Sequence, residues 1–333
     1  MDPLNLVSVA RRLIDIDSTT GQEGAAGRAI TELLESRGWR VRYQPVAGDR
    51  FNIVAYVDRP EPTITFSTHY DCVPPFFGSR VEGGRLYGRG ACDAKGILVA
   101  QLAAAERLRA QGRTDVALLF VVGEERGSDG AATANAEPLP SRFLVNGEPT
   151  DNRLGVATRG VLRLRLRASG RAAHSSYPEL GVSAIEKLVD ALVSLRLLDL
   201  PADDLLGATH YTVGVIQGGV APNVVPADAS AEVLFRTIGE ADAVREQLSG
   251  LKALVDVEDV LEIAPVRMHV IDGFETAVFP YTTDVPLLTN WGTPLLYGPG
   301  SIHVAHTDDE HVRVGDLERA VADYVEIAGV LSR

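Results

Sequence analysis

The sequence has no apolar run that approaches the roughly 20 residues needed to cross a bilayer, so we expect no transmembrane helix. Its two cysteines, Cys72 and Cys92, are too few for a disulfide framework and fit a reducing compartment, where each is expected to be a buried small thiol. Residues Met1 to Thr20 carry no basic-then-apolar secretion signal. These absences together predict a cytoplasmic location.

Basic residues are also scarce, since 32 lysines and arginines face 45 aspartates and glutamates and the formal net charge is -13. This balance argues against nucleic acid or an anionic membrane as a partner. The chain is 45% hydrophobic and 23% charged, which is typical of a soluble globular protein with a large core. At 333 residues it exceeds the usual size of one domain, so we expect two.

Five short segments, far apart in the sequence, carry residue types that bind divalent metals. They are Thr68-His69-Tyr70-Asp71, the run from Gly88 to Gly96 around Asp93, Gly123-Glu124-Glu125, Asn146-Gly147-Glu148 and Ala305-His306. Two imidazoles and several carboxylates exceed what one ion needs and suit two ions that share an oxygen ligand. The segments therefore predict a metal-activated hydrolase, provided that they converge.

Alternating apolar strands and helices predict an α/β domain with a mostly parallel sheet. Helices are expected over 4–16, 24–37 and 94–110, and strands over 52–57, 63–67 and 116–122. His69, the Glu124–Glu125 pair and Glu148 each follow a predicted strand. Ligands of such sheets bind beyond the carboxyl ends of the strands, so these side chains are expected at one crevice.

The pattern changes near Gly160, where leucines alternate with arginines over 162–167 as in a half-exposed antiparallel strand. A helix over 182–197, strands over 210–217 and 229–236, a helix over 240–251 and a strand over 257–263 are then expected. This β-α-β-β-α-β order is that of the ferredoxin-like unit. We predict a catalytic domain of residues 1–158 and 271–333, ending in a helix over 317–331, interrupted by an inserted domain of residues 159–270.

In this order the segments resemble the M20 family of metallopeptidases and deacylases, which includes acetylornithine deacetylase, succinyl-diaminopimelate desuccinylase and carboxypeptidase G2-like enzymes. The resemblance covers essentially the whole chain. It is nearest to the acetylornithine deacetylase branch through the run 298–302, Gly-Pro-Gly-Ser-Ile, followed by Ala305-His306 and Asp309-Glu310. It implies that the inserted domain is a lid that also forms a homodimer.

The family pattern implies two divalent metal ions, zinc in the first place, with cobalt or manganese as alternatives. His69 and Glu148 would hold one ion, and Glu125 and His306 the other. Asp93 would bridge the two ions, and in relatives a cis peptide follows this residue. His303, three residues before His306, is a competing ligand that the family context disfavours.

Two further carboxylates receive roles from the resemblance. Asp71 would orient His69, and two residues apart in an extended chain do point to the same side. Glu124 would be the general base that takes a proton from the attacking water and returns it to the leaving amine. Adjacent glutamates with different duties require the chain to leave strand geometry, which Gly123 and Gly127 permit. Taken singly, a Glu-Glu pair or a His-x-Asp is more often a solvated turn or a surface pair.

The resemblance also gives the inserted domain functional residues. His174 would reach the active site of the partner subunit and stabilise the oxyanion, and its alternative is a loop histidine bonded to neighbouring hydroxyls. Asn223 and Arg236 would bind the substrate carbonyl or carboxylate, although Arg236 could instead form a structural ion pair. Backbone N–H groups around Gly300 would contact the same carboxylate, unless that loop is only a turn.

The sequence therefore predicts a zinc-dependent amidohydrolase that removes an acyl group from an N-acyl amino acid, similar to acetylornithine deacetylase and suited to amino-acid biosynthesis. A dipeptidase or carboxypeptidase of the same family is the main alternative, and a metal-free binding protein on the same fold belongs to another class. Arg163, Arg165 and Arg167 leave a third possibility, a face that docks an amino-group carrier protein. We favour for these arginines the solvated face of an edge strand.

Overall fold

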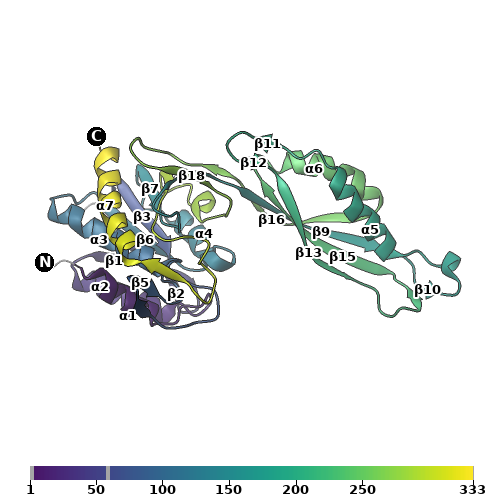
Figure 1. Ribbon diagram of the computed structural model, residues 1–333, viewed down its shortest axis with the longest axis horizontal. Coiled ribbons are helices and arrows are strands. Elements are labelled where there is room, and N and C mark those ends of the chain that lie inside the picture. The colour runs from purple at the N-terminus through teal and green to yellow at the C-terminus, as the bar shows by residue number, and fades with distance from the viewer. Residues whose placement is uncertain (1–3, 58–60, 333) are drawn as a thin grey trace. The chain divides into compact units, whose positions relative to one another are not determined.

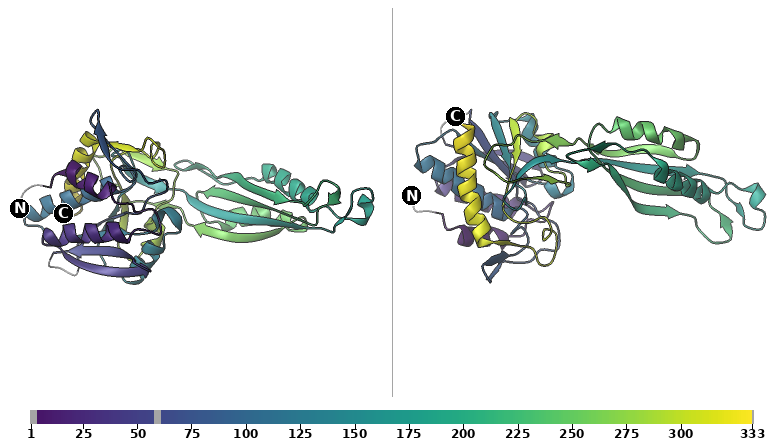
Figure 2. Two further views of the ribbon diagram at one scale, coloured as in Figure 1. Left: turned by 90° about the horizontal axis from the view of Figure 1, so that it is seen from below. Right: turned by 45° about the horizontal axis from the view of Figure 1, so that its top comes forward.

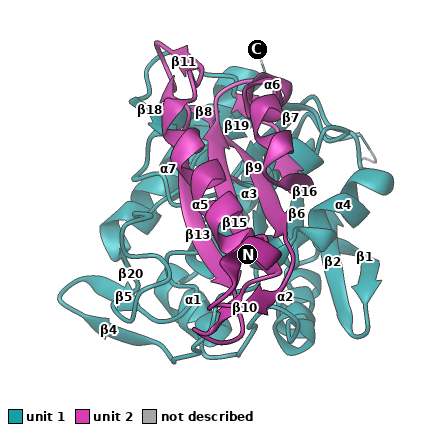
Figure 3. Ribbon diagram, turned by 90° about the vertical axis from the view of Figure 1, so that its right-hand side faces the viewer, with its two compact units in different colours: residues 1–156, 268–279, 283–333 teal, residues 157–267, 280–282 magenta. Residues whose placement is uncertain are grey.

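The computed structural model describes residues 4–57 and 61–332 and divides the chain into two compact units. Unit 1 contains Met1–Val156, Met268–Phe279 and Thr283–Arg333, and unit 2 contains Ala157–Arg267 and Pro280–Thr282 (Figure 3). Both ends of the described chain belong to unit 1 (Figure 2). Among the described residues, no helix is long and apolar enough to cross a membrane.

A nine-stranded sheet, which lies in unit 1 except for β17 and the last two residues of β8, forms the centre of that unit (Figure 1). Its order is β1-β2-β6-β3-β7-β19-β8-β17, with β18 paired to β8. The strands are β1 (Arg40–Ala47), β2 (Arg50–Tyr56), β3 (Ile64–His69), β6 (Val116–Val121), β7 (Phe143–Asn146), β8 (Leu154–Thr158), β17 (Val266–Arg267), β18 (Thr276–Phe279) and β19 (Thr293–Leu296).

The expectation of a mostly parallel sheet is wrong, because this sheet is mixed. Only the central strands β6, β3, β7 and β19 run parallel to one another. β1, β2, β8 and β17 pair antiparallel with their neighbours. The error has a physical source: β3 and β6 are buried on both faces, as strands of parallel sheets commonly are, whereas the polar-patterned hairpin partner β1 gives no such signal.

Four of the five α-helices described in unit 1 begin and end close to the predicted positions, and α4 was not predicted. They are α1 (Leu6–Ile14), α2 (Gly24–Ser36), α3 (Lys95–Ala110), α4 (Asp129–Ala136) and α7 (Val314–Leu331). Asn5 begins α1 by accepting a hydrogen bond from the N–H of Ser8 at 3.0 Å. α3 is apolar around most of its circumference and is accordingly buried from Lys95 to Ala105, within the main core.

A small three-stranded sheet in unit 1 has the order β20-β5-β4, with β4 (Arg80–Glu82), β5 (Arg85–Tyr87) and β20 (His311–Arg313). β20 pairs with β5, so the segment that follows His306 lies beside the segment that precedes Asp93. This pairing joins two parts of the chain more than two hundred positions apart, as measured by the hydrogen bond from Arg89 to Glu310 (|i−j| = 221).

Unit 2 contains the predicted β-α-β-β-α-β order. Its elements are β9 (Gly160–Ser169), α5 (Ala184–Ser194), β13 (His210–Gly218), β15 (Asp228–Thr237), α6 (Asp242–Leu248) and β16 (Asp256–Ile263). The four strands form an antiparallel sheet in the order β13-β15-β9-β16. Both helices pack on one face, over a separate core that contains Leu164, Leu188 and Val244 (Figure 2). Two short two-stranded sheets, β10 (Ala173–His174) with β14 (Val224–Val225) and β11 (Ala202–Asp203) with β12 (Gly207–Ala208), complete the unit.

The expectation that the arginine-rich strand lies at a sheet edge is also wrong. β9 lies between β15 and β16, and its arginines face acidic residues on both neighbours. Arg165 lies 2.9 Å from Glu232 and 3.5 Å from Glu258, and Arg167 lies 3.2 Å from Glu258. Cross-strand ion pairs, rather than simple solvation, therefore account for the alternation of Leu and Arg.

Candidate metal centre

The carboxyl ends of the parallel strands bring the predicted ligands of unit 1 together. His69 ends β3, Glu148 follows β7 by two residues, and Glu125 follows β6 in the short 3-10 helix η1 (Glu124–Arg126). Two groups form there, His69 with Asp93 and Glu148, and Asp93 with Glu125 and His306. Within each group the candidate ligand atoms all lie within 4.8 Å of one another. His303 is exposed and belongs to neither group.

Asp93 is common to both groups. Its Oδ1 lies 2.9 Å from Nε2 of His69, and its Oδ2 lies 3.3 Å from Nε2 of His306. Each carboxylate oxygen therefore faces a different imidazole, which is the arrangement that a bridging carboxylate requires. The peptide bond between Asp93 and Ala94 is cis.

The remaining ligand candidates complete the two groups. Glu125 Oε2 lies 2.9 Å from Nε2 of His306. Glu148 is 4% exposed, and its Oε1 is buried without a hydrogen-bond partner among the described residues. A buried carboxylate oxygen without a partner is costly, and a cation is the natural group to satisfy it. The donor set thus fits two divalent ions.

The pKa shifts of the candidate ligands also indicate a site for cations. Burial opposes the charged form of both His69 and Asp93, yet hydrogen bonds with Asp71 and Asp93 raise the pKa of His69, and hydrogen bonds with His306 and His69 lower that of Asp93. Hydrogen bonds to Asp93 and Glu125 raise the pKa of His306 to about 10. Burial first, and then neighbouring carboxylates, raises the pKa values of Glu125 and Glu148. These shifts indicate a buried cluster of carboxylates and imidazoles whose charges a bound cation would balance.

Asp71 connects His69 to the glutamate pair. Its Oδ1 lies 3.4 Å from Nδ1 of His69, and its backbone oxygen lies 3.2 Å from the same nitrogen. The carboxylate also accepts the N–H of Glu124 at 3.1 Å and the N–H of Glu125 at 3.2 Å. Thr20 donates its hydroxyl to Oδ2 at 2.8 Å. The contact with His69 was expected, whereas the two backbone bonds were not.

Glu124 lies in a sharp turn, as its sequence predicts. Gly123 and Gly127 on either side of η1 have φ values of 76° and 96°. A residue with a side chain would be strained in this left-handed conformation. Burial and the nearby charge of Glu148 raise the pKa of Glu124 well above its usual range. A carboxylate with a raised pKa beside candidate ligands is suited to accept and return a proton near neutral pH.

Asp284 is a carboxylate near this site that the sequence did not indicate. It is 1% exposed, and its Oδ1 has no hydrogen-bond partner among the described residues. Burial raises the pKa of Asp284 to about 7, against a lowering hydrogen bond with Ser128. Ser128 begins α4 and has a φ of 53°, so Asp284 contacts a strained residue just beyond the Glu124 turn. In the sequence, a single aspartate in a loop cannot be told from a solvated one, so Asp284 is recognised only by its burial in the structure.

Two of the functional residues predicted in unit 2 lie together, and the third does not lie with them. His174 is exposed in β10, which pairs with β14 next to Asn223. The backbone oxygen of Asn223 accepts the N–H of Ser175 at 3.0 Å. His174 Nδ1 accepts the N–H of Ser176 at 3.1 Å. Arg236 pairs with Val161 near the opposite end of β15, which begins at Asp228. Eight strand residues span about 26 Å, so one small molecule cannot touch all three in the same chain.

Arg236 has no acidic partner among the described residues of unit 2, and its Nη1 is buried without a hydrogen bond. Burial and the neighbouring Arg159 lower its pKa. Arg159 donates to the backbone oxygen of Ala208 at 2.9 Å and contacts His210 Nδ1 at 2.8 Å, but its Nε is also without a partner. The alternative of a structural ion pair for Arg236 is therefore wrong, and Arg159 was not indicated by the sequence.

Gly300 packs against the residue that precedes Asp93. Its φ is 84°, and an added Cβ would lie 2.6 Å from Sγ of Cys92. Its carbonyl oxygen accepts the N–H of Asp151 at 2.7 Å. Cys72 and Cys92 are both free and buried, as expected.

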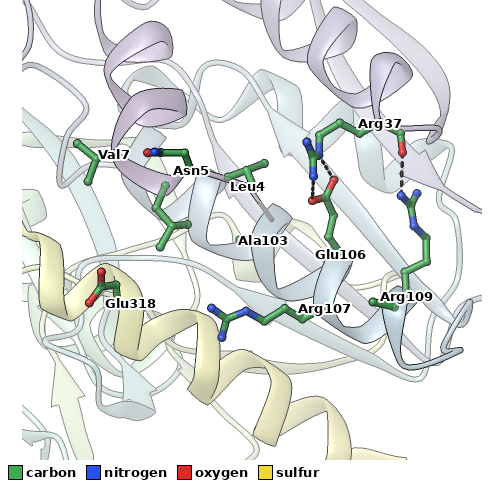
Figure 4. A pocket seen from close by; sticks show the side chains of 11 residues that line it. Leu4, Asn5, Val7, Arg37, Ala103, Glu106, Arg107, Arg109 and Glu318 are labelled. Carbon is green, nitrogen blue, oxygen red and sulfur yellow. Dashed lines mark hydrogen bonds and ion pairs between the residues drawn. The ribbon is translucent and has the colours of Figure 1, made fainter. Parts of the chain in front are cut away.

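A separate cavity of about 930 Å³ lies on unit 1 beside α1, α3 and α7 (Figure 4). Its lining includes Leu4, Ala103, Arg107 and Glu318, together with the ion pair of Arg37 and Glu106. None of the candidate metal ligands lines it. The chemistry of the metal centre therefore does not extend to this cavity.

Comparison with known proteins supports the same assignment. The model of peptidase family M20/M25/M40 matches residues 65–329. A probable carboxypeptidase of Aspergillus clavatus is 39% identical over 368 aligned positions, which cover 97% of this chain and 81% of the relative. In fold, the chain is similar to a tripeptidase of Staphylococcus aureus with a TM-score of 0.83 and 20% identity, covering 100% and 99% of the two chains. It is also similar to a dinuclear metal binding peptidase of the M20 family from Bacillus subtilis, with a TM-score of 0.74, 18% identity and coverage of 98% and 97%.

The family match spans most of the chain and includes the strand ends, the Asp93 loop and the His306 loop. The chain therefore belongs to peptidase family M20/M25/M40, whose members are metal-dependent hydrolases acting on amide bonds.

Proposed function

We propose that this protein is a dinuclear metallopeptidase of the carboxypeptidase or dipeptidase type. It hydrolyses the amide that joins an acyl group to an amino acid with a free carboxylate. The observation that carries the proposal is the position of Asp93, with one carboxylate oxygen 2.9 Å from His69 and the other 3.3 Å from His306.

His69, Glu148 and one oxygen of Asp93 would hold one divalent ion, and Glu125, His306 and the other oxygen the second. Zinc suits this set of imidazoles and carboxylates, and cobalt or manganese would bind the same donors. When bound, two such ions would polarise the amide carbonyl and lower the pKa of water near it. Asp71 holds His69 in the tautomer that leaves Nε2 free.

Glu124 moves the proton in this mechanism. Its carboxylate takes a proton from the attacking water while the water oxygen bonds to the amide carbon. It then delivers that proton to the leaving nitrogen as the C–N bond breaks, so the products are a carboxylic acid and a free amine. The raised pKa of Glu124 makes its carboxylate a stronger base for the first half of this transfer.

Arg236 supports a requirement for a free carboxylate on the substrate. Its guanidinium lacks an acidic partner among the described residues, and one buried N–H is unsatisfied. A carboxylate would supply the missing acceptor in a planar, two-point contact. Asn223 would bind the substrate carbonyl, and N–H groups around Gly300 are proposed to contact the carboxylate side of the substrate.

The proposed peptidase and its main alternative, a deacetylase, differ in the acyl group of the substrate. The 39% identical relative is a probable carboxypeptidase, which favours a peptidyl acyl group. The deacetylase of N-acyl amino acids is the second candidate, because an acetyl group and a peptidyl group present the same amide to the same carboxylates. A role in amino-acid biosynthesis, or on an amino-group carrier protein, would follow only from that second candidate.

A homodimer that completes the site in trans is supported by two features of unit 2. Asn223 and the paired His174 strand precede the start of β15 at Asp228, and Arg236 lies about 26 Å further along that strand, so contact of all three with one substrate needs two chains. In addition, β13 is an edge strand, and α5 continues with an exposed apolar stripe at Ile185, Val189, Val193 and Leu197. His174 would then stabilise the oxyanion in the active site of the partner. We further propose a cytoplasmic location, in keeping with two free thiols.

A hydrolysis screen tests the proposal. Dipeptides, tripeptides and N-acetyl amino acids are incubated with protein loaded with zinc, cobalt or manganese, and the released amine is quantified. Cleavage of peptides with a free C-terminal carboxylate, and not of their C-terminal amides, supports the proposed function. Cleavage of acetyl-amino acids alone would favour the deacetylase, and no hydrolysis of either class with any metal would refute both.

A further inference from the structure

Glu310 is a fully buried glutamate that binds the loop carrying Asp93. Its exposed fraction is 0%, and its Oε1 accepts backbone N–H groups from Gly90 at 2.9 Å, Cys92 at 3.2 Å and Asp93 at 3.2 Å. Three backbone donors on one carboxylate oxygen fix the path of the chain from Gly90 to Asp93. The last of these donors belongs to the residue that faces both imidazoles.

The other carboxylate oxygen of Glu310 is engaged as well. Nη1 of Arg89, itself 1% exposed, lies 2.5 Å from Oε2. Nε of Arg89 donates to the backbone oxygen of Pro75 at 3.2 Å, and the guanidinium lies 4.9 Å from the centre of the Phe77 ring. The backbone oxygen of Glu310 accepts the N–H of Gly88 at 3.2 Å. Both carboxylate oxygens of Glu310 are therefore bonded within the protein, and Glu310 belongs to neither group of candidate ligands.

The position of Glu310 in the chain lets its carboxylate connect the two segments that carry His306 and Asp93. It follows His306 by four residues and immediately precedes β20. Its carboxylate thus ties the His306 segment to the Asp93 segment, in addition to the pairing of β20 with β5. A shift of either segment would move an Asp93 oxygen away from one of its two imidazoles.

We propose that Glu310 is a positioning residue that sets Asp93 between the two metal sites. The inference rests on the metal-binding part of the proposed function and not on the identity of the substrate. A carboxylate that bridges two ions must present both oxygens at once, so its backbone has to be fixed more tightly than that of a ligand to one ion. Glu310 supplies this restraint through Asp93 N–H, and it acts on both metal sites together.

The test compares Glu310→Gln with a control at a similar ion pair elsewhere in unit 1. Glu106 lies on α3 and pairs with Arg37, whose Nη2 lies 2.6 Å from Oε2 of Glu106 (Figure 4). It is 11 residues beyond Lys95, about 16 Å along the helix axis, and is therefore remote from the metal centre. Glu106→Gln removes the charge of a largely buried glutamate without touching the Asp93 loop. Glu310→Asp is the conservative variant, with a carboxylate one methylene too short for both sets of bonds.

Metal-free protein is titrated with cobalt chloride, and binding is followed by calorimetry and by the visible absorption of bound cobalt. We expect Glu310→Gln to weaken cobalt binding about 10- to 100-fold, as loss of a residue behind a metal ligand commonly does. Glu310→Asp should fall between it and wild type, and Glu106→Gln should match wild type even where its melting temperature drops.

Wild-type affinity for two cobalt ions in Glu310→Gln would overturn the inference. Should that variant not fold, wild-type affinity in Glu310→Asp would do the same, and failure of both to fold would show that Glu310 serves folding instead. Fewer than two cobalt ions in the wild-type protein would instead refute the proposed function, so the two failures are distinguishable.

Discussion

The N–H of Glu124 donates a hydrogen bond of 3.1 Å to the carboxylate of Asp71. The same carboxylate accepts the N–H of Glu125 and lies 3.4 Å from His69, so one side chain orients a ligand to each metal site and the proposed base. The role expected for Asp71 concerned His69 alone. Because Asp71 binds the first two N–H groups of η1 as well as His69, it connects metal binding with proton transfer.

Replacing Asp71 should therefore damage both functions at once. Asp71→Asn places an NH2 group where an oxygen now accepts a backbone N–H, which leaves one buried donor facing another. We expect metal affinity to fall about 10- to 100-fold, with a further loss of kcat in fully loaded enzyme. Thr20→Val, which removes the hydroxyl bond to the same carboxylate and a longer one to the Cys72 backbone oxygen, is the control and should have a smaller effect. Unchanged affinity and kcat in Asp71→Asn would contradict this role.

Glu124→Ala separates proton transfer from metal binding. Because Glu124 belongs to neither ligand group, its removal should leave metal content close to that of wild type. Turnover should drop at least about 100- to 10,000-fold, the range typical for the loss of a general base. Metal content and kcat are measured on the same preparation. Loss of metal from this variant would mean that the roles of Glu124 and Glu125 are exchanged.

His174→Ala tests whether the active site is shared between subunits. The variant alone should show a reduced kcat, since the oxyanion would lose its proposed stabilising group. Mixed with Glu124→Ala under conditions that exchange subunits, it should regain up to about a quarter of wild-type activity, because half of the dimers then contain one complete site. The mixing ratio and exchange are verified with differently tagged chains. Proven exchange without recovery would exclude action in trans.

Asp284 predicts a pH dependence for the stability of the metal-free protein. Its pKa in the folded state is about 7, above the ordinary 3.8, so ionisation in the folded state costs free energy. Stability contributed by the protonated form is complete below the unfolded value and is lost as pH rises toward 7, at up to about 1.4 kcal/mol per pH unit. Asp284→Asn should therefore raise the free energy of unfolding more at about pH 8 than at about pH 5, as measured by urea titration. An equal effect at both pH values would contradict the burial argument.

The sequence could predict the centre of the site because its ligands are attached to strongly patterned strands. His69 and Glu148 follow buried parallel strands whose carboxyl ends meet at one edge, and the flanking glycines of Glu124 indicate its turn. Strand order could not be predicted as well, since pairing partners depend on contacts between distant segments. For this reason the sheet of unit 1 proved mixed, and the Arg165 strand proved internal.

The roles of Asp284 and Glu310 near the metal centre, and of Arg159 beside Arg236, could not be predicted from the sequence for a different reason. Asp284, Glu310 and Arg159 lie in loops or at strand ends where a charged residue is ordinarily solvated. Their importance comes from burial and from partners far away in the chain, such as Arg89 for Glu310. The local spacing of residue types indicates neither their burial nor their distant partners.

The most direct test of the account is the zinc content of the protein, measured by mass spectrometry after metal removal, reconstitution and extensive dialysis. Two ions bridged by Asp93 require two zinc ions per wild-type chain and at most one in Asp93→Ala. Fewer than two in wild type, or two retained in Asp93→Ala, would contradict the bridged centre on which the proposed function rests.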